Sequence, residues 1–419
     1  MDFRTFRKSG HWPTLLAAFL YFDFSFMVWV TLGPLMIYIA RDIPLSVDEK
    51  FTLVAIPVLS GALLRVPLGT IADRVGSKRT AIVAQSVVIV ALAWAWLAGL
   101  HSRAEIALLG TALGVAGASF AVALPQASRW YPPRYQGIVM GIAGAGNMGV
   151  VLDAMIAPWF AERWGWQNTF GMLLAPLALT LVIYVLIAKD APIACKPIDW
   201  ANYKALLRDQ DSWWFMFFYF ITFGGFVGLA NALPLYFTMQ YHVSGIAAGL
   251  MVALIVMFGS CFRPVGGFIA DRVGGIRSLL VLFSVVAAAY FVTAQMPAGP
   301  EPGEGGGWSF FAMPAIAWVS VLLFSSGVLA LGMGNGAVFQ LLPQRFRHEI
   351  GTMTGMVGCA GGIGGFFLAQ TLGLSKSTTG DFAAGFIVFG ILALAGLLVL
   401  VRLKGRWRTT WGALSEARI

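Results

Sequence analysis

Twelve apolar runs follow one another along this chain, and their length decides what the chain can fold into. Each run is long enough to cross the roughly 30 Å hydrocarbon core of a bilayer, which takes about 20 helical residues. The runs cover residues 14–39, 51–72, 80–100, 104–128, 137–160, 168–188, 212–238, 245–270, 278–297, 310–342, 351–374 and 382–402. Inside a bilayer the backbone must satisfy its own hydrogen bonds, so runs of this kind form helices. The sequence predicts an all-α polytopic membrane protein with 12 transmembrane helices.

The charged residues agree with this interpretation and give it an orientation. They make up 11% of the chain, whereas soluble domains average about 25%. With twelve spans, 21 of the 28 Lys and Arg residues fall on the side of the N-terminus and 5 on the other side. Because basic loops are retained in the cytoplasm, we expect both termini there. The net charge of +9 is spread over short loops, so it does not indicate a nucleic-acid partner.

The chain also repeats itself. The longest polar interruption, 189–211, predicts a cytoplasmic linker between an N-terminal six-helix bundle (1–188) and a C-terminal one (212–402), followed by a cytoplasmic tail (403–419). RVPLGTIADRVGSKR at 65–79 and RPVGGFIADRVGGIR at 263–277 match at 9 of 15 positions. Repeats of this kind form two pseudo-symmetric walls of a transporter, with the substrate held between them near the midplane.

The repeated segment resembles the loop signature of the major facilitator superfamily. The matching residues are Gly69, Asp73, Arg74, Gly76, Lys78 and Arg79 in the first copy and Gly267, Asp271, Arg272, Gly274 and Arg277 in the second. The resemblance implies the major facilitator fold. It also implies that these residues act as a conformational latch between the cytoplasmic ends of helices during alternating access.

A narrower resemblance covers most of the chain. FDFSFMVWVTLGPL (22–35), GIAGAGNMGVVLDAMIAP (141–158), VGCAGGIGGFF (357–367) and one arginine each in the second and eighth spans are similar to the nitrate/nitrite porter family. The resemblance implies a nitrate transporter, with nitrite as a possible second anion, in the bacterial cytoplasmic (inner) membrane. It places Gly144, Gly146, Gly361 and Gly362 in the two glycine-rich nitrate signatures. A monomer surrounded by lipid is expected.

Depth within the membrane brings unusual residues to one layer. Arg65 and Arg263 each precede the aspartate of their motif by eight residues, which is about 12 Å of helix. By the same measure Asn147, Phe120, Tyr219, Phe223, Gly361 and Gly362 lie near that level. Two guanidinium groups, which stay charged, indicate an anion, and their flat forks suit a flat anion such as nitrate.

Structural roles are the alternative for each of these residues. The arginines would then form a salt-bridge node, and the aromatic side chains would be ordinary packing, as we expect for Met27 and Trp29. In the site interpretation, Asn147 donates a neutral hydrogen bond, and Phe120, Tyr219 and Phe223 form the walls.

Two carboxylates inside spans bear on coupling. An ionisable side chain in a membrane is a functional candidate, so Asp23 and Asp153 are candidates for proton coupling, with Asp23 ranked first because it lies nearer the arginine layer. Local hydrogen bonding is the alternative for both.

Proton-coupled nitrate uptake is the favoured function. A nitrate/nitrite antiporter, a porter of another anion and a non-transporting anion receptor stay open. The histidines and cysteines build no catalytic or metal-binding cluster, so no enzyme and no cofactor are expected.

Overall fold

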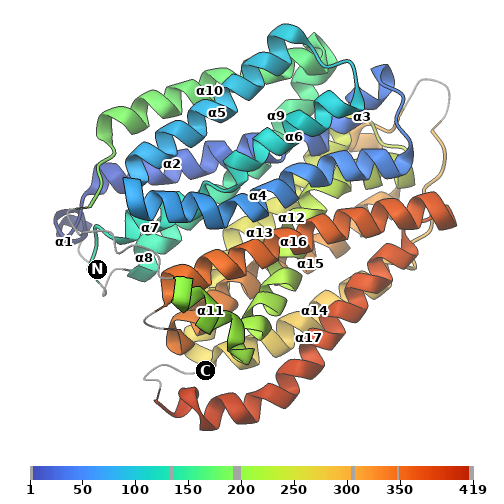
Figure 1. Cartoon of the computed structure of the whole chain (residues 1–419). Helices are drawn as coiled ribbons and strands as arrows, with labels where there is room; N and C mark the ends of the chain where they lie inside the picture. Colours follow the sequence, from blue (N-terminus) through green and yellow to red (C-terminus); the bar gives the residue numbers. More distant parts are fainter. Residues whose placement is uncertain (1–2, 133–135, 192–199, 303–306, 347–348, 415–419) are drawn as a thin grey trace.

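The computed structural model describes residues 3–132, 136–191, 200–302, 307–346 and 349–414 (Figure 1). The parts of the expected linker and tail at 192–199 and 415–419 lie outside the described residues. The helices, with 3₁₀ turns marked η, are α1 (Phe3–Lys8), α2 (Trp12–Trp29), α3 (Leu32–Asp42), α4 (Val47–Val75), α5 (Ser77–Ala98), α6 (Arg103–Gly117), α7 (Phe120–Ser128), α8 (Gln136–Gly144), η2 (Ala145–Met148), α9 (Gly149–Trp164), α10 (Trp166–Ile187), α11 (Trp200–Arg208), α12 (Gln210–Tyr241), α13 (Gly245–Val273), α14 (Gly275–Thr293), η3 (Phe310–Ala312), α15 (Ala315–Arg345), α16 (Ile350–Thr379), α17 (Ala383–Thr409) and η4 (Trp411–Leu414).

The predicted all-helical membrane fold is confirmed. Eleven helical segments of the described chain are long and apolar enough to cross a membrane. The remaining predicted span, 137–160, is the continuous segment α8–η2–α9, in which a 3₁₀ turn separates two shorter helices. With this segment, the described part of the chain has the expected twelve spans.

Most helices begin or end a few residues away from the predicted runs, and two of these differences have a clear physical reason. Helix α15 begins at Ala315 rather than at 310, because Pro314 disfavours helical backbone at the residue before it. Helix α17 continues to Thr409, so the expected tail begins inside a helix. The extension is held by Trp407, whose buried ring stacks on Phe215 at 5.1 Å and donates to Asp211 Oδ1 at 2.8 Å.

Three spans of the first half are interrupted, each inside the membrane. The helix breaks at Val30–Thr31 between α2 and α3, at Ala118–Ser119 between α6 and α7, and at η2. Irregular backbone is tolerated at membrane depth where it is buried in protein or lines a cavity. The corresponding helices of the second half, α12, α15 and α16, run unbroken for 32, 31 and 30 residues.

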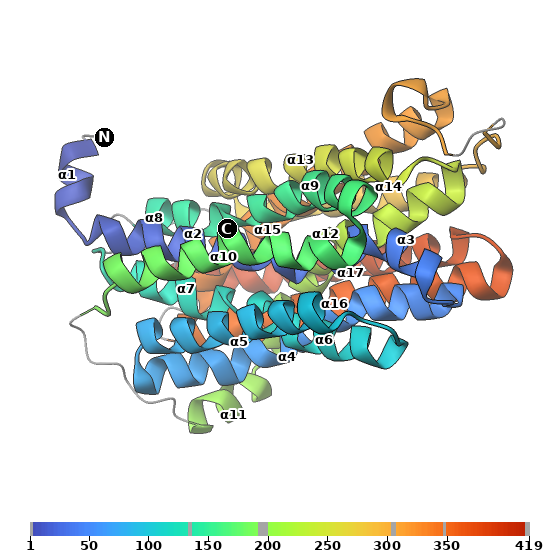
Figure 2. The ribbon, with the colours of Figure 1, turned by 90° about the horizontal axis from the view of Figure 1, so that it is seen from above.

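The two halves lie side by side, with the blue-to-green helices of the first half against the yellow-to-red helices of the second (Figures 1 and 2). They meet mainly along three helix pairs, α4 with α16, α9 with α13, and α3 with α12, where a Cβ on Gly33 would lie 2.9 Å from the Asn231 carbonyl oxygen. On the first pair Thr52 donates to Gln370 at 3.3 Å near one membrane surface, and Arg65 donates to the Gly358 carbonyl near the middle. Just before α9, Ser260 Oγ of α13 donates to the carbonyl of Asn147 in η2 at 3.4 Å.

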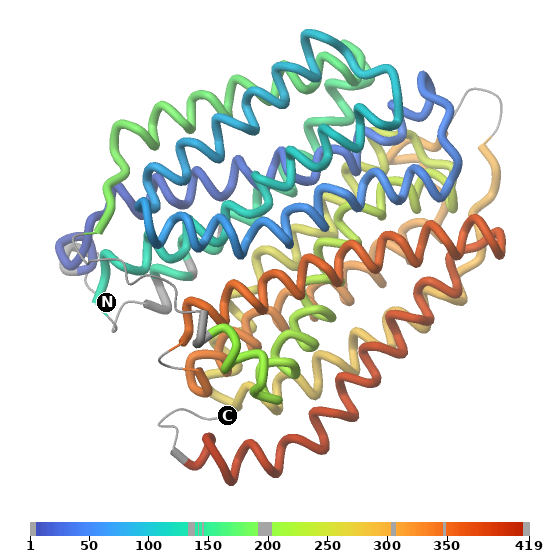
Figure 3. Tube along the Cα trace, viewed as in Figure 1, coloured from blue at the N-terminus to red at the C-terminus, as the bar shows by residue number. Residues whose placement is uncertain are grey.

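Closer to the chain termini, the halves part. A Cβ atom added to Gly351 or Gly355 of α16 would meet nothing within 4 Å. A Cβ on Gly69 would contact only Ala121 of its own half. The tube drawing shows that both termini lie at this end of the molecule (Figure 3). The described conformation is therefore closed on the side away from the termini and open on their side.

Candidate anion site

Arg65 is almost completely buried, at 1% exposed, in the middle of α4. Its Nε donates to the Gly117 carbonyl at 3.3 Å, and its Nη1 donates to the Gly358 carbonyl of the other half. The break after α6 leaves the Gly117 carbonyl available, because Ala121 N–H donates to Ala118 instead. The Nη2 of Arg65 has no hydrogen-bond partner among the described residues. One arm of this guanidinium is therefore left for another acceptor.

Three aromatic rings surround the Arg65 guanidinium. The Cζ atom lies 5.6 Å from the ring centroid of Trp29, 5.3 Å from that of Phe120 and 5.0 Å from that of Phe223. Ring faces attract a cation at these distances without neutralising it. The Trp29 ring is fixed by its own hydrogen bond to the Pro57 carbonyl at 2.7 Å. Trp29, expected to be a core or lipid-facing residue, is in the core and also contacts the buried cation.

Arg263 is half-buried on α13 and faces the same aromatic group. Its Nη2 donates to Tyr219 Oη at 3.4 Å, and its Cζ lies 5.6 Å from the Phe339 ring centroid. Its Nη1 is buried without a partner among the described residues. The rings of Phe223, Tyr219 and Phe339 connect the two arginines: Tyr219 stacks on Phe223 at 5.1 Å, and Phe339 meets Tyr219 edge-on at 5.2 Å. Phe339, on α15, was not among the predicted residues.

Neither arginine is neutralised by a carboxylate. Six ion pairs occur among the described residues, and none of them includes Arg65 or Arg263. A buried charge without a counter-charge is costly, so a structural salt-bridge node does not account for these two residues. The arrangement provides two cations, each with one unpartnered buried N–H arm, beside a wall of aromatic rings.

The glycines of the eleventh span bring α16 against this wall. A Cβ on Gly361 would lie 2.6 Å from Tyr219 Cδ1 and 2.9 Å from Phe223 Cδ1. A Cβ on Gly362 would lie 2.5 Å from Ala62 Cβ, so this glycine allows α16 to approach α4. Only glycine permits these approaches without displacing the neighbour. Gly361 thus belongs to the aromatic wall, and Gly362 belongs to the contact between the halves.

The fifth span contributes one polar side chain. Asn147 lies in η2, is 2% exposed, and its Oδ1 has no hydrogen-bond partner among the described residues. Its carbonyl contact with Ser260 places it one helical turn from Arg263. Gly146 is a packing residue, since a Cβ there would lie 2.4 Å from Phe22 Cδ1. Gly144 faces open space.

The two candidate proton-coupling residues lie away from the arginines, between α2 and α9. Asp23 Oδ1 accepts a hydrogen bond from the Gly149 N–H at 2.7 Å, and the residue is 6% exposed. Asp153 is completely buried, and both of its carboxylate oxygens lack a hydrogen bond of normal geometry within the described structure. Neither forms an ion pair with a described residue.

The predicted latch residues lie at the end of the molecule that carries the termini. Asp73 forms an ion pair with Arg129 at the end of the fourth span. Gly76 and Gly274 have φ values of +103° and +104°, which only glycine adopts readily. The two copies are not equivalent, because Arg345 at the end of the tenth span pairs with Asp209 and Asp211 of the linker region.

The remaining predicted latch residues are placed as follows. Four of them, Arg74, Arg79, Asp271 and Arg272, are exposed, and the Arg272 guanidinium lies over the Phe268 ring at 4.1 Å. A Cβ added to Gly69 or Gly267 would lie 3.7 Å from the nearest atom of a neighbouring helix of the same half.

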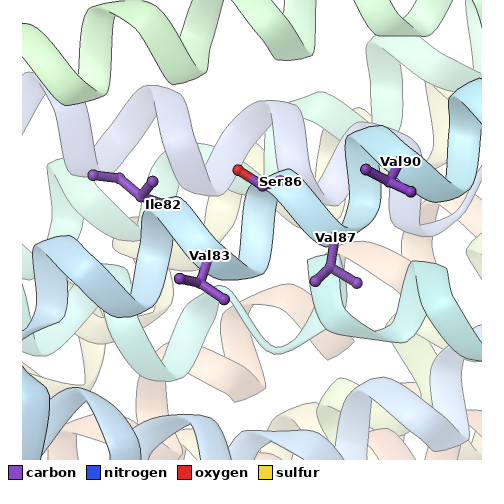
Figure 4. A pocket seen from close by; sticks show the side chains of 5 residues that line it. All are labelled: Ile82, Val83, Ser86, Val87 and Val90. Atoms are coloured by element: carbon purple, nitrogen blue, oxygen red, sulfur yellow. The ribbon is translucent and has the colours of Figure 1, made fainter.

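An open hollow on the surface of α5 is a different kind of feature. It is lined by Ile82, Val83, Ser86, Val87 and Val90 (Figure 4). Val83 and Val90 are 65% and 67% exposed. A row of exposed valines on an outer helix is typical of a surface that faces lipid chains, so we do not assign the substrate to it.

Comparisons with known proteins agree with this geometry. Residues 15–369 match the family model described as Major Facilitator Superfamily. The chain is 32% identical over 379 residues to the "Nitrite extrusion protein" of Bacillus subtilis, covering 90% of each chain. It is 33% identical over 375 residues to the "Probable nitrate/nitrite transporter NarK2" of Mycobacterium tuberculosis, covering 88% of this chain and 91% of that one. It is also 31% identical over 385 residues to the "Probable nitrate transporter NarT" of Staphylococcus carnosus, covering 90% and 91%.

The fold is shared with a solved transporter. The xylose transporter XylE from E. coli superposes with a TM-score of 0.67 over 94% of this chain and 98% of that one, at 14% sequence identity.

Proposed function

We propose that this chain, which belongs to the nitrate/nitrite porter family of the major facilitator superfamily, carries nitrate, and also nitrite, across the cytoplasmic membrane by alternating access. Membership of the family, expected from the sequence motifs, is confirmed, and with it the chain is a membrane transporter and not an enzyme. The substrate, the coupling and the orientation are our proposals.

The observation that carries the substrate proposal is the pair of unneutralised guanidinium groups. Arg65 and Arg263 each keep one buried N–H arm without a partner in the described structure. Nitrate and nitrite are flat monovalent anions, whose oxygens suit the planar fork of arginine. The rings of Phe120, Tyr219, Phe223 and Phe339 form flat walls beside both cations. We assign the anion to the space between the two free arms, with Asn147 as a neutral donor.

The contacts between the halves support alternating access as the mechanism. With both termini in the cytoplasm, the described conformation is the inward-facing one. The bundles 1–188 and 212–402 rock about the anion, so that the α4–α16 and α9–α13 contacts open and the cytoplasmic ends close. The Asp73–Arg129 pair and the paired glycine turns would then form the latch that stabilises one of the two states.

We expect locking the closed side to stop transport. Thr52 and Gln370 are joined by a side-chain hydrogen bond of 3.3 Å across the halves. In a Thr52→Cys, Gln370→Cys variant, an oxidant should abolish nitrate flux and a reductant should restore it. Each single cysteine variant is the control and should keep its flux under oxidant. Full flux in the cross-linked double variant would contradict the rocking mechanism.

Uptake of an anion into a negative-inside cell needs a driving force, and we favour proton symport through Asp23. This carboxylate is buried, accepts a hydrogen bond from the Gly149 N–H and has no cation partner among the described residues. A carboxylate that takes up a proton as nitrate binds would couple the two movements. Exchange of nitrate for nitrite is the second candidate, because one of the relatives is named for nitrite extrusion.

Labelled-nitrate uptake into proteoliposomes separates these functions. We expect an outside-acid pH gradient to raise accumulation at least about fivefold, with nitrite but not tetrahedral sulfate competing. Nitrate should also alkalinise the outside medium, and Asp23→Asn should remove this signal while nitrate–nitrate counterflow continues. Accumulation that depends only on internal nitrite would favour the antiporter. Binding without any flux would indicate a receptor.

A further inference from the structure

A second buried carboxylate lies deeper in the same helix pair as Asp23. Asp153 is 0% exposed, and neither of its oxygens has a hydrogen bond of normal geometry within the described residues. Its interaction partner is the side chain of Thr31, whose hydroxyl oxygen is likewise without a described hydrogen bond. A carboxyl group buried in this way needs either a partner or a proton, so Asp153 is a candidate proton-binding residue.

Asp23 and Asp153 lie at two depths of one helix interface. Asp23, on α2, meets α9 at Gly149, where a Cβ would lie 2.0 Å from the Asp23 carbonyl oxygen. Asp153 lies four residues farther along α9, which is one helical turn or about 6 Å, and it meets the chain after α2 at Thr31. The two carboxyl groups therefore follow each other along the α2–α9 interface, away from the arginines.

The other titratable groups on the helices around this interface have partners elsewhere. Tyr21 of α2 packs its ring on Tyr184 of α10, and Tyr184 donates to Gln126. Arg41 of α3 pairs with Glu162 and lies over the Tyr38 ring, and Cys261 of α13 contacts Met148. Within the described chain no cation is paired with Asp23 or Asp153. The two carboxyl groups thus have each other as the nearest unpaired acids on this interface.

Asp153 also lies next to the closed contact between the halves. The carbonyl of the following residue, Ala154, would be 2.3 Å from a Cβ on Gly249 of α13, so the two backbones touch there. This contact is on the side away from the termini and must separate when that side opens. Asp23, 6% exposed, is the more accessible carboxyl in the conformation open toward the termini.

We propose that Asp153, assisted by the Thr31 hydroxyl, is a second proton-binding site, loaded from the outside and emptied toward Asp23. This inference rests on the proposed symport. It places the proton path along the α2–α9 interface and separates that path from the path of the anion. In the outward-facing state, external water protonates the Asp153 carboxylate. As the halves rock, that proton moves along the α2–α9 interface to the Asp23 carboxylate, and Asp23 then releases it to the cytoplasm. One proton enters and one leaves, and Asp153 is again a carboxylate ready for the next cycle.

The test compares coupled uptake with counterflow in the full-length protein. We expect Asp153→Asn to reduce pH-gradient-driven nitrate accumulation and nitrate-driven proton uptake at least tenfold. Nitrate–nitrate counterflow, which needs no net proton movement, should stay within twofold of wild type. Asp153→Glu should recover part of the coupling. The matched control is Asp48→Asn, at an exposed acid in the first turn of α4.

A second variant keeps the test decisive if Asp153→Asn is poorly folded. Thr31→Val removes the hydroxyl at nearly constant volume and should lower coupled uptake several-fold with counterflow intact. Proton uptake at the wild-type level in folded Asp153→Asn would overturn the inference, and so would a parallel loss of counterflow, which would mark a structural role. A wild-type protein that moves no protons with nitrate would instead refute the proposed symport.

Discussion

Replacing Arg65 by lysine should lower nitrate uptake at subsaturating concentration by at least about 100-fold. The guanidinium reaches the Gly117 carbonyl of one half and the Gly358 carbonyl of the other and still keeps one arm free. A lysine has one nitrogen at the end of a flexible stem and cannot hold this geometry. Hydrogen bonds to charged groups contribute about 1.5–3 kcal/mol each. Losing two of them gives the expected factor, at about tenfold for each 1.4 kcal/mol.

The controls for this variant separate charge from geometry. Arg263→Lys should show a comparable loss, because the Arg263 Nη2 also donates within the protein while its Nη1 stays without a partner among the described residues. Arg103→Lys should stay within twofold of wild type, since Arg103 is a surface residue paired with Glu49. Membrane levels are measured by immunoblot, and uptake by filtration of vesicles. Wild-type uptake by Arg65→Lys at equal protein level would rule out the two-fork site.

Adding one methyl group at Gly361 should reduce transport at least about tenfold. A Cβ there would lie 2.6 Å from Tyr219 and 2.9 Å from Phe223, so the stacked rings or α16 must move. Overpacking of a tight contact costs about 1–3 kcal/mol. Because both rings stand between the arginines, we expect the displacement to change the apparent affinity for nitrate as well as the rate.

Helix α16 supplies its own control for that substitution. Gly355→Ala lies six residues earlier, where a Cβ meets nothing within 4 Å, and should leave initial rates within twofold. Initial rates over a range of nitrate concentrations give both parameters. Equal behaviour of the two alanine variants would show that the contact between Gly361 and the rings has no part in transport.

The sequence was most informative about depth. Counting residues inward from the cytoplasmic ends of the spans brought Arg65, Arg263, Tyr219 and Phe223 to one level, and in the structure these four side chains do belong to one connected group. The membrane fold followed from run length, because a bilayer permits few alternatives.

The residues that the sequence analysis missed are those whose role depends on which way a side chain points around its helix axis. Phe339 is one of 32 phenylalanines and sits in no motif, so only the packing of α15 shows that it faces Arg263. The Gly358 carbonyl that accepts from Arg65 is a backbone group and has no sequence signal. The pairing of Asp23 with the Gly149 N–H depends on the interruption at η2, which glycine-rich composition alone does not specify.

The interruptions of the first, fourth and fifth spans have a mechanical consequence. Each interrupted helix can change direction at its break, whereas α12, α13, α15 and α16 are continuous rods of 29 to 32 residues. The sequence repeat would lead one to expect two equivalent lever arms, yet only the first half has joints. With the second half as the stiffer frame, we expect the internal bending of the proposed transport cycle to be concentrated in residues 1–188. Its joints lie at the same levels as Arg65's acceptor Gly117, Asp23's donor Gly149 and Asp153's neighbour Thr31, so one flexing motion would reach both the anion and the proton path.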